Sequence, residues 1–578
     1  METARGGLRE GGAAFSLLRC AAAVLAAAAA AACASRAPVP LRTEPVPLAD
    51  TLPIEEPAAR PALEAGRLFK QVTGGQLTRP LDLRRLLDDR HPALNVTRFD
   101  RVVASSWFEP RIGAGGLSPA EVADGDADAP PDSAGPLTVV AGKSAGISPG
   151  FTVRDASGRR YLFKFDPRGH LHLASTADVV SARLLRAAGY HVPEEYKVAF
   201  DADRLELAPD AEVETSEGVE RPMRRSDVRA ILERTDTLPD GRHVALASRF
   251  VPGVPKGPFH FGGRREDDPN DHYEHQHRRE LRGLYVLAAW LNHVDIRFAN
   301  TLTSYVEPGY LRHYLIDFGA TLGSGTIRPH LPREGAEHNF DLWRSVGRLL
   351  TLGFYRTGWE GAPRPEPLHP QVGWMPVEGF DPDGWAPNWP NPAFWSMTPA
   401  DAYWAAKIVA AFGDAHLRAA VRAGKLPDPA AADTLADALI HRRDRTVAHW
   451  YAEVTPLEAP AARTSTTEGG PPVLELAFRD LGLEEALWSP AQTTYRWRFR
   501  HPAAGIDRRG RTRARRRETQ AVEVPLSAAV RGAPTGGTEA LATLEVTAVR
   551  PRTSGREAVV HLRWTGPERG YEVAGLRH

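Results

Sequence analysis

Two neighbouring stretches decide the fold: LNHVDIRFANTLTSY at residues 291–305 and YLIDFGATLGSG at residues 314–325. In order, they contain His293, Asp295, Asn300 and Asp317, the last of these at the end of an apolar run. An Asp, an Asn five residues later and a strand that ends in Asp place three oxygen ligands at the mouth of one cleft. Because Mg²⁺ prefers oxygen ligands, the two stretches predict a magnesium site.

Such a set suits phosphoryl transfer, which needs a carboxylate to orient or deprotonate the nucleophile and metal ligands to neutralise the phosphates. The order and spacing resemble the protein-kinase-like superfamily, which includes eukaryotic-type kinases, aminoglycoside phosphotransferases, and the HipA-like and phosphoinositide-kinase branches. The family's catalytic loop reads His-Arg-Asp-x-Lys-x-x-Asn and precedes Asp-Phe-Gly. This chain departs from that loop at two positions, with Val294 for the arginine and Arg297 for the lysine.

The resemblance implies a role for each matching residue. It makes Asp295 the catalytic base and Arg297 the phosphate contact, with Asn300 and Asp317 as ligands of Mg²⁺ or Mn²⁺. It also implies ATP or another nucleotide as the phosphate donor. The missing loop arginine puts control by a phosphorylated activation loop in doubt.

The residues before this loop supply further parts in the family's order. Three short runs, LTVVAGKSAG, GFTVRDASG and RRYLFKFDP, are separated by glycine-bearing turns and predict strands. The first turn contains three glycines, Gly142, Gly146 and Gly150. Glycines at these positions would let backbone amides approach the phosphates of a nucleotide. Lys164, one of only seven lysines beside 65 arginines, lies in the third strand. The resemblance pairs it with an acid on the next helix, predicted to start at Ser175 or Thr176, where Asp178 is the nearest candidate.

The length and charge bound the organisation of the chain. At roughly 100–200 residues per domain, 578 residues predict two or three folded units. The 72 basic residues balance 72 acids, so we expect no nucleic-acid partner. We divide the chain into a signal peptide (1–33), a proline-rich tether (34–60), an extension (61–136), a β-rich part (137–255), a helical part (256–455) and a β-rich C-terminal domain (470–578). We therefore expect an α+β fold, with a two-lobed protein-kinase-like core and a C-terminal β domain whose expected form is a sandwich.

The N-terminus is typical of a secretory signal, because arginines precede an unbroken apolar run from Cys20 to Ala32. Neither this run nor any later one approaches the roughly 20 residues that span a bilayer, so we expect membrane contact through a lipid anchor only. Ala-Ala-Ala-Cys33 resembles a bacterial lipobox, which implies lipidation of Cys33; cleavage at a nearby Ala-x-Ala is the alternative. No aspartate follows Cys33, and in this the chain resembles lipoproteins of the outer membrane, on its periplasmic or surface face. The layout also resembles bacterial envelope proteins with a kinase-like core.

Two further clusters each have a functional and a structural interpretation. The segment DDPNDHYEHQHRRE (267–280) gathers acids and histidines, but it lacks a His-Glu-x-x-His pattern, so a solvated polar loop is favoured over a zinc site. Six tryptophans lie among prolines, at positions 359, 374, 385, 389, 395 and 404. Packing of this long loop onto the helical part is favoured over stacking on sugar rings.

The C-terminal domain contains a strongly basic segment. Ten arginines and one acid, Asp507, lie between Arg496 and Arg517. A solvated hairpin is the default interpretation. Attraction to an anionic surface of the cell envelope is the alternative.

Taken together, these features predict an exported, lipid-anchored protein that carries out magnesium-dependent phosphoryl or nucleotidyl transfer to an envelope acceptor that the sequence does not name. The alternative is a kinase-fold scaffold without catalysis, which binds an envelope polymer or a protein partner. The alternative has weight because an exported domain meets little free ATP.

Overall fold

The computed structural model describes residues 41, 48–61, 91–125, 130–132, 134–143, 148–215, 218–360, 365–465, 471–551 and 553–578. Cys33, Gly146, the signal peptide and part of the tether lie outside the described residues. The fold is mixed α+β, as predicted, with one large mixed sheet and several smaller sheets. None of the described helices has both the length and the apolar character needed to cross a bilayer.

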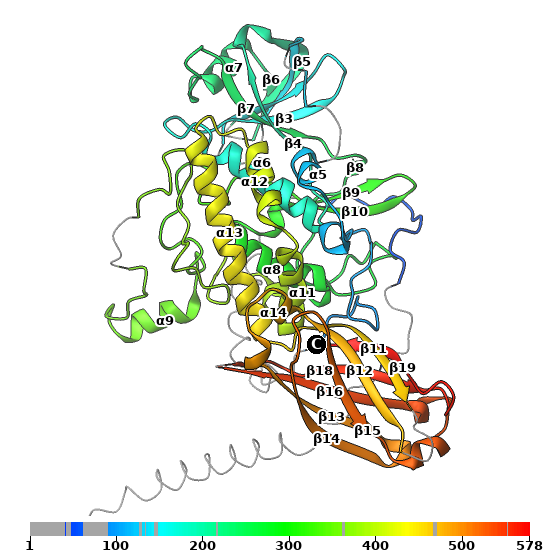
Figure 1. Cartoon of the computed structure of the whole chain (residues 1–578). Coiled ribbons are helices and arrows are strands. Elements are labelled where there is room, and N and C mark those ends of the chain that lie inside the picture. The colour runs from blue at the N-terminus through cyan, green and yellow to red at the C-terminus, as the bar shows by residue number, and fades with distance from the viewer. Residues whose placement is uncertain are drawn as a thin grey trace, which may run out of the picture.

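A seven-stranded sheet forms one end of the molecule, at the top of Figure 1. Its strand order is β4-β7-β3-β2-β1-β5-β6, and β1 and β5 are its parallel pair. Alternating residues such as Phe151, Tyr161 and Phe163 are buried in a separate core, which is why these short runs form strands, as predicted. The strands are β1 (Leu137–Gly142), β2 (Gly150–Arg154), β3 (Arg160–Lys164), β4 (Glu195–Phe200), β5 (Leu205–Glu214), β6 (Glu220–Pro222) and β7 (His243–Arg249); helix α7 (Arg225–Leu232) lies between β6 and β7.

Helix α6 (Leu173–Ala188) follows β3 and is buried on almost every side. Its first residue, Leu173, lies two residues before Ser175, the first of the two positions predicted to cap the helix. The carboxylate of Asp166 accounts for this difference, because it accepts hydrogen bonds of 2.8–2.9 Å from the backbone N–H groups of His172, Ala174 and Ser175. Asp166 therefore ties the start of α6 to the end of β3.

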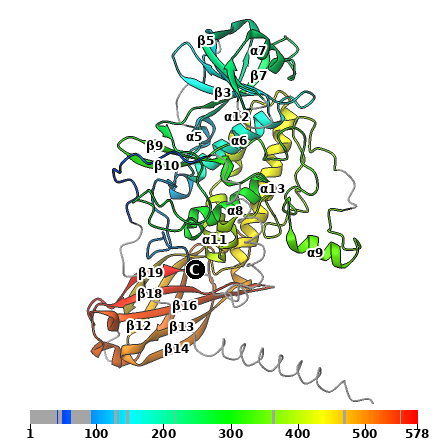
Figure 2. The same ribbon diagram turned by 180° about the vertical axis from the view of Figure 1, so that it is seen from behind.

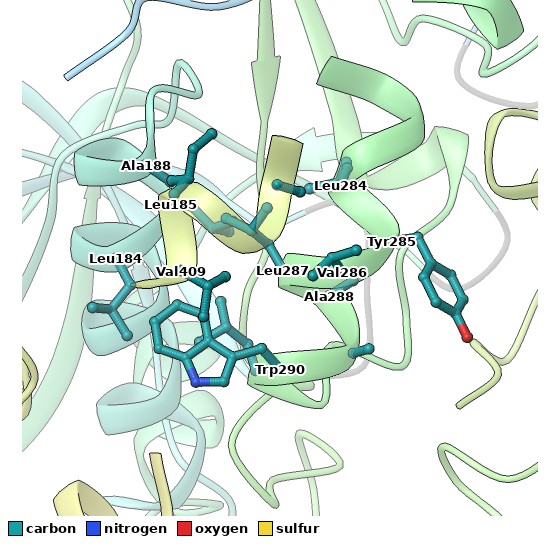
Figure 3. Packing of buried hydrophobic residues seen from close by; sticks show 14 of the residues in the cluster. Leu184, Leu185, Ala188, Leu284, Tyr285, Val286, Leu287, Ala288, Trp290 and Val409 are labelled. Atoms are coloured by element: carbon teal, nitrogen blue, oxygen red, sulfur yellow. The ribbon is translucent and has the colours of Figure 1, made fainter. Parts of the chain in front are cut away.

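The helical part packs against α6. Figure 3 shows Leu184 and Leu185 of α6 beside Leu287 of α8 and Val409 of α11, within one large hydrophobic core. Every residue of α8 is buried. The helices of this part are α8 (Arg279–Leu291), α9 (Leu342–Leu350), α10 (Pro392–Trp395), α11 (Pro399–Ala410), α12 (Asp414–Ala423) and α13 (Pro429–Ala452), and the short helix α5 (Pro119–Asp124) comes earlier in the sequence, before β1. A three-stranded sheet joins β8 (Val254–Pro255), β9 (Thr301–Val306) and β10 (Tyr310–Leu315).

The C-terminal domain lies at the opposite end from the seven-stranded sheet (Figures 1 and 2). It has two sheets, and buried side chains of both, including Leu476 and Val546, form one hydrophobic core. The first sheet joins β11 (Leu457–Ser465), β12 (Val473–Asp480) and β15 (Gln520–Pro525). The second joins β14 (Ile506–Arg513), β13 (Thr494–His501), β16 (Leu541–Arg550), β18 (Ala558–Trp564) and β19 (Tyr571–Arg577), with β17 (Thr553–Ser554) paired to β16; helix α14 (Leu481–Glu484) follows β12.

The prediction of a solvated loop at residues 267–280 is wrong, because its acids and histidines are partly drawn into the interior. Asp271 is buried and contacts His275 at 2.8 Å and Arg278 at 3.3 Å. The Arg278 guanidinium compensates the charge of Asp271, as a buried charge requires. Among the described residues, no three His, Cys, Asp or Glu side chains are grouped so that they could hold a metal ion.

The tryptophan-rich segment packs onto the helical part, as predicted. Trp385 and Trp404 are buried and the other four tryptophans are partly buried. The indole N–H of Trp385 donates to the side-chain oxygen of Asn292 over 3.0 Å. The segment therefore supports the chain immediately before His293.

Candidate functional site

Lys164 lies at the centre of the candidate site, at the end of β3. Its ammonium nitrogen is 3.0 Å from Asp178 Oδ2 on α6 and 3.0 Å from Asp317 Oδ1 after β10. Three segments that are far apart in the sequence therefore meet at one cation. The structure brings Lys164 together with Asp178, the acid that the sequence predicted to pair with it, and with Asp317, which the sequence predicted as a metal ligand.

A third carboxylate, which the sequence analysis missed, lies near Lys164. Glu195 of β4 is buried, and its Oε1 accepts a 2.8 Å hydrogen bond from the Ser248 hydroxyl. Its Oε2 is buried and, among the residues that the structure describes, has no hydrogen-bond partner. In the sequence, Glu195 could have been noticed as a charged residue at the start of an apolar strand. Its position near Lys164 could not be predicted, because it depends on the pairing of β4 with β7 and of β7 with β3.

These charges shift one another's pKa values in opposite directions. Burial raises the pKa of Asp178 and, with Asp178 nearby, that of Glu195. The Lys164 ammonium holds the pKa of Asp317 below its usual range. Burial opposes the charge of Lys164, but Asp178 and Asp317 outweigh burial and raise its pKa. At neutral pH the site therefore holds a charged lysine and a charged Asp317.

The backbone at Asp317 has an unusual conformation. Its φ angle is 65°, in the left-handed region that side chains other than glycine rarely adopt. The next N–H, of Phe318, donates to Asp178 Oδ1 over 3.2 Å, and the Phe318 ring is fully buried. The Asp317 side chain, in contrast, is 52% exposed. Such strained conformations cluster at functional sites, where the surrounding contacts hold them.

The turn after α8 aligns the second half of the site. Asn292 ends α8 in the left-handed conformation, with φ 51°. The His293 ring then packs edge-on against Phe318, with ring centroids 5.9 Å apart. Burial lowers the pKa of His293 to about 4, so the imidazole is neutral at neutral pH. Because His293 contacts the residue beside Asp317, the two motifs are held in register.

Asp295, Arg297 and Asn300 form a second cluster. The side-chain amide of Asn300 donates to the backbone oxygen of Asp295 at 2.8 Å and to its Oδ2 at 3.0 Å. Arg297 Nε lies 3.3 Å from Asp295 Oδ1. Burial raises the pKa of Asp295, and the negative charge of Asp317 is near enough to add to this effect. The β9–β10 hairpin returns the chain to this point, because the N–H of Ile316 donates to the Asn300 carbonyl over 3.1 Å.

Two of the three candidate glycines lie at close contacts between strands. A Cβ at Gly150 would come within 2.4 Å of the Phe163 carbonyl oxygen, and one at Gly142 within 2.6 Å of the Val213 side chain. Both glycines are thus required for packing, whatever else they do. Lys143, which follows Gly142 and was also missed, donates to the Ser148 carbonyl over 2.9 Å, and burial lowers its pKa.

The cleft at Lys164 is narrow. Its volume is about 10 Å³, which is room for roughly one water molecule. Its lining includes the carboxylates of Asp178 and Asp317, together with Ser148, Ser175 and Thr326. A nucleotide would enter only if the sheet and the helical part moved apart.

Comparisons with known proteins add little to this geometry. No protein-family model matches the chain, and no curated protein matches its sequence. A crystal structure of a Helicobacter pylori proinflammatory kinase, CtkA, is similar over 54% of this chain and 93% of that chain, with 9% sequence identity and a TM-score of 0.27. At this TM-score the likeness carries no weight, and the site is interpreted from its own contacts.

Proposed function

We propose that the chain is a kinase-like phosphotransferase that transfers a phosphoryl or nucleotidyl group from a nucleotide to an acceptor in the cell envelope. The contact of Lys164 with both Asp178 and Asp317, beside the Asp295–Asn300 pair, carries this proposal. In this proposal the seven-stranded sheet and the helical part are the two lobes of a kinase-like core. The narrow cleft between them is the nucleotide site.

The oxygen atoms of the site fit a magnesium ion. Asp317 Oδ1 contacts Lys164, and the exposed side chain leaves its second oxygen accessible. The amide nitrogen of Asn300 is engaged by Asp295, which leaves the amide oxygen of Asn300 to face a metal. Mg²⁺ in phosphotransferases commonly uses one or two protein oxygens and completes its shell with phosphates and water. When bound, the ion would neutralise the phosphate charge.

Asp295 is the residue suited to receive the acceptor's proton. During transfer a hydroxyl oxygen of the acceptor bonds to phosphorus, the bond from phosphorus to the leaving phosphate oxygen breaks, and the hydroxyl proton passes to Asp295. A raised pKa makes Asp295 a better proton acceptor than an ordinary exposed aspartate. Arg297 and Asn300 hold its carboxylate in place.

The test separates binding from chemistry. Wild type should bind a nucleotide by calorimetry only when Mg²⁺ or Mn²⁺ is present. Asp317→Asn should weaken this binding at least tenfold, whereas Asp295→Asn should leave affinity within a few-fold and lower turnover by roughly 10². Glu233→Gln, at the exposed residue that follows α7, is the matched control. If wild type binds no nucleotide with either metal, the proposal is wrong.

The narrowness of the cleft favours a second candidate function, a kinase-fold scaffold that binds an envelope polymer or a protein partner without catalysis. A scaffold should show no turnover in any variant. If it binds a nucleotide at all, Asp317→Asn should leave the affinity unchanged.

We also propose that the chain is an outer-membrane lipoprotein anchored through Cys33, with multiple acyl chains because a single chain binds only marginally. Cys33→Ser should release a soluble, folded protein. Unchanged membrane fractionation of that variant would contradict the anchor.

The basic segment supports a further proposed contact, with an anionic envelope surface. Its strands β13 and β14 form a hairpin in which Arg496 is opposite Arg511 and Arg498 is opposite Arg509. Most of the arginines are exposed, although Asp507 contacts Arg498 at 2.6 Å. Replacing the arginines at 508–517 with glutamine should abolish salt-sensitive binding to anionic vesicles. Unchanged vesicle binding would remove this contact from the proposal.

A further inference from the structure

A second and larger cavity lies where the C-terminal end of α6, the residues after β7 and strand β10 meet. Its volume is about 580 Å³, within the range of small-molecule sites. Four arginines from four different segments line it: Arg111, Arg186, Arg249 and Arg312. None of the residues of the Lys164 site lines this cavity.

The acids of this cavity do not balance its arginines. Glu194 is one of the two acids in the lining; Arg183, outside the lining, contacts it at 2.6 Å, and Arg186 of the lining contacts it at 3.6 Å. The other acid, Glu109, contacts Arg111 at 2.7 Å, and more than half of its side chain is exposed to solvent. The lining therefore carries an excess of positive charge.

The pKa values of two residues in the lining are shifted by these arginines and by burial. Burial, together with Arg312 and Arg111, lowers the pKa of His191 to about 4, although a Ser105 backbone contact and Glu109 act in the other direction. Burial and the nearby Arg111 also lower the pKa of Arg186, against the pull of Glu194 and Glu109. Both shifts are those expected where burial and neighbouring cations act on the same group.

We infer that this cavity binds a phosphate-bearing small molecule. Guanidinium groups form paired, charge-assisted hydrogen bonds with phosphate oxygens, and arginines on several segments can surround a multiply charged anion. Tyr314 lines the same cavity and offers a hydroxyl. Phe250 also lines the cavity and is 45% exposed, with the Arg160 guanidinium over its ring at 4.8 Å from the centroid; the exposed part of the ring offers an apolar contact to the uncharged part of the ligand.

The cavity shares a wall with the Lys164 site. Glu194 lines the cavity, whereas the next residue, Glu195, lies near Lys164. The Glu194 carbonyl accepts a 2.9 Å hydrogen bond from the N–H of Arg249, so the two walls of the cavity are joined at this point. Arg186 lies about 12 Å along α6 from Asp178. A ligand in the cavity would thus contact the elements that hold the acids around Lys164.

The experiment uses the purified full chain and sodium pyrophosphate as the probe, titrated by calorimetry at constant ionic strength. Wild type should bind pyrophosphate, and Arg249→Gln and Arg312→Gln should each weaken the binding at least tenfold. Arg312→Lys should weaken it less, because the charge remains while the paired hydrogen bonds are lost. Arg563→Gln, an exposed arginine of β18, should stay within twofold of wild type. Arg111 is left unchanged because its guanidinium also holds two backbone carbonyls.

Lys164→Met locates the binding. If the cavity is the site, this variant should bind pyrophosphate as wild type does, even if nucleotide binding fails. Loss of pyrophosphate binding in Lys164→Met, with both arginine variants unaffected, would assign the anion to the cleft and overturn the inference. The result does not depend on the proposed activity, since no turnover is measured.

Hydrogen exchange of wild type keeps the inference testable if a variant does not fold. Pyrophosphate should protect residues 186–194 and 249–252, and protection confined to residues 150–164 would overturn the inference. Equal affinity for citrate would overturn its specificity for phosphate. The protein could instead bind vesicles that contain phosphatidic acid, in a way that depends on Arg312, and fail to bind pyrophosphate. That result would assign the cavity to a lipid headgroup and overturn the inference that its ligand is a small soluble molecule.

Discussion

Two buried charge clusters, one beside the seven-stranded sheet and one in the C-terminal domain, are built in opposite ways. In the C-terminal domain, Asp480 accepts hydrogen bonds from Arg550 and, over 2.7 Å, from Tyr495. The Asp480 and Arg550 side chains are 1% and 2% exposed. At the other cluster, Lys164 is surrounded by Asp178, Glu195 and the half-exposed Asp317.

The difference lies in balance and access. The Asp480 cluster has one acid and one base and is closed to solvent, which suits a structural role. The Lys164 cluster has more acids than bases, two carboxyl groups with raised pKa values and one left-handed residue at its rim. An excess of like charge beside a cleft lowers the free energy of unfolding. Proteins keep such destabilising groups at sites where the groups are needed for binding.

The largest loss of stability is expected for Arg550→Met. It leaves Asp480 buried without its cation, which costs about 3–5 kcal/mol in the free energy of unfolding. Urea denaturation followed by circular dichroism measures this loss. Nucleotide binding should be unchanged, and a variant as stable as wild type would show that the cluster is not structural.

A smaller loss, below about 3 kcal/mol, is expected for Lys164→Met at pH 7. The acids that lose their cation can take up protons instead, because burial already raises the pKa of Asp178 and of Glu195. In wild type, Lys164 lowers the pKa of Asp317, so this stabilisation is present above the ordinary pKa of an aspartate and is lost as pH falls through the lowered value. The difference between wild type and variant should therefore shrink once the pH falls below the ordinary aspartate pKa of 3.8, as urea denaturation at pH 7 and at about pH 3 would show. Lys164→Arg is the control, and a pH-independent loss as large as that of Arg550→Met would make the two clusters equivalent.

Tyr495→Phe should cost about 2 kcal/mol, since it removes one hydrogen bond to a buried carboxylate. The matched change at the other cluster, Ser248→Ala, removes the hydroxyl that donates to Glu195. It should cost less, about 1 kcal/mol, because a carboxyl group with a raised pKa is less dependent on donors. Thermal unfolding of both variants tests the order, and the reverse order would contradict the comparison.

The smallest change in stability at pH 7 is expected for Glu195→Gln, within about 0.5 kcal/mol of wild type, because the amide resembles a protonated carboxyl group. The raised pKa of Glu195 means that the folded state binds more protons than the unfolded state, so wild type should gain stability as pH falls from 8 towards 5. This part of the pH dependence should disappear in Glu195→Gln and persist in the surface control Glu233→Gln. An unchanged slope in Glu195→Gln would show that Glu195 is ionised in the folded protein.

The sequence by itself determined the local parts of this protein. Alternating apolar residues indicated β1, β2 and β3, and the 3.6-residue period indicated α6 and α8, because both patterns depend on side chains a few positions apart. The spacing of Asp295, Asn300 and Asp317 was also readable, since a single hairpin, β9–β10, connects them.

Only the tertiary structure decided what meets Lys164 and what is buried. Glu195 enters the site through the strand order β4-β7-β3, Asp166 sets the start of α6 from the end of another strand, and the polar loop at 267–280 is drawn inward by Arg278. The arginine-lined cavity likewise combines residues that are up to about 200 positions apart. Such contacts depend on how sheets and helices pack, and no pattern within a single segment specifies that packing.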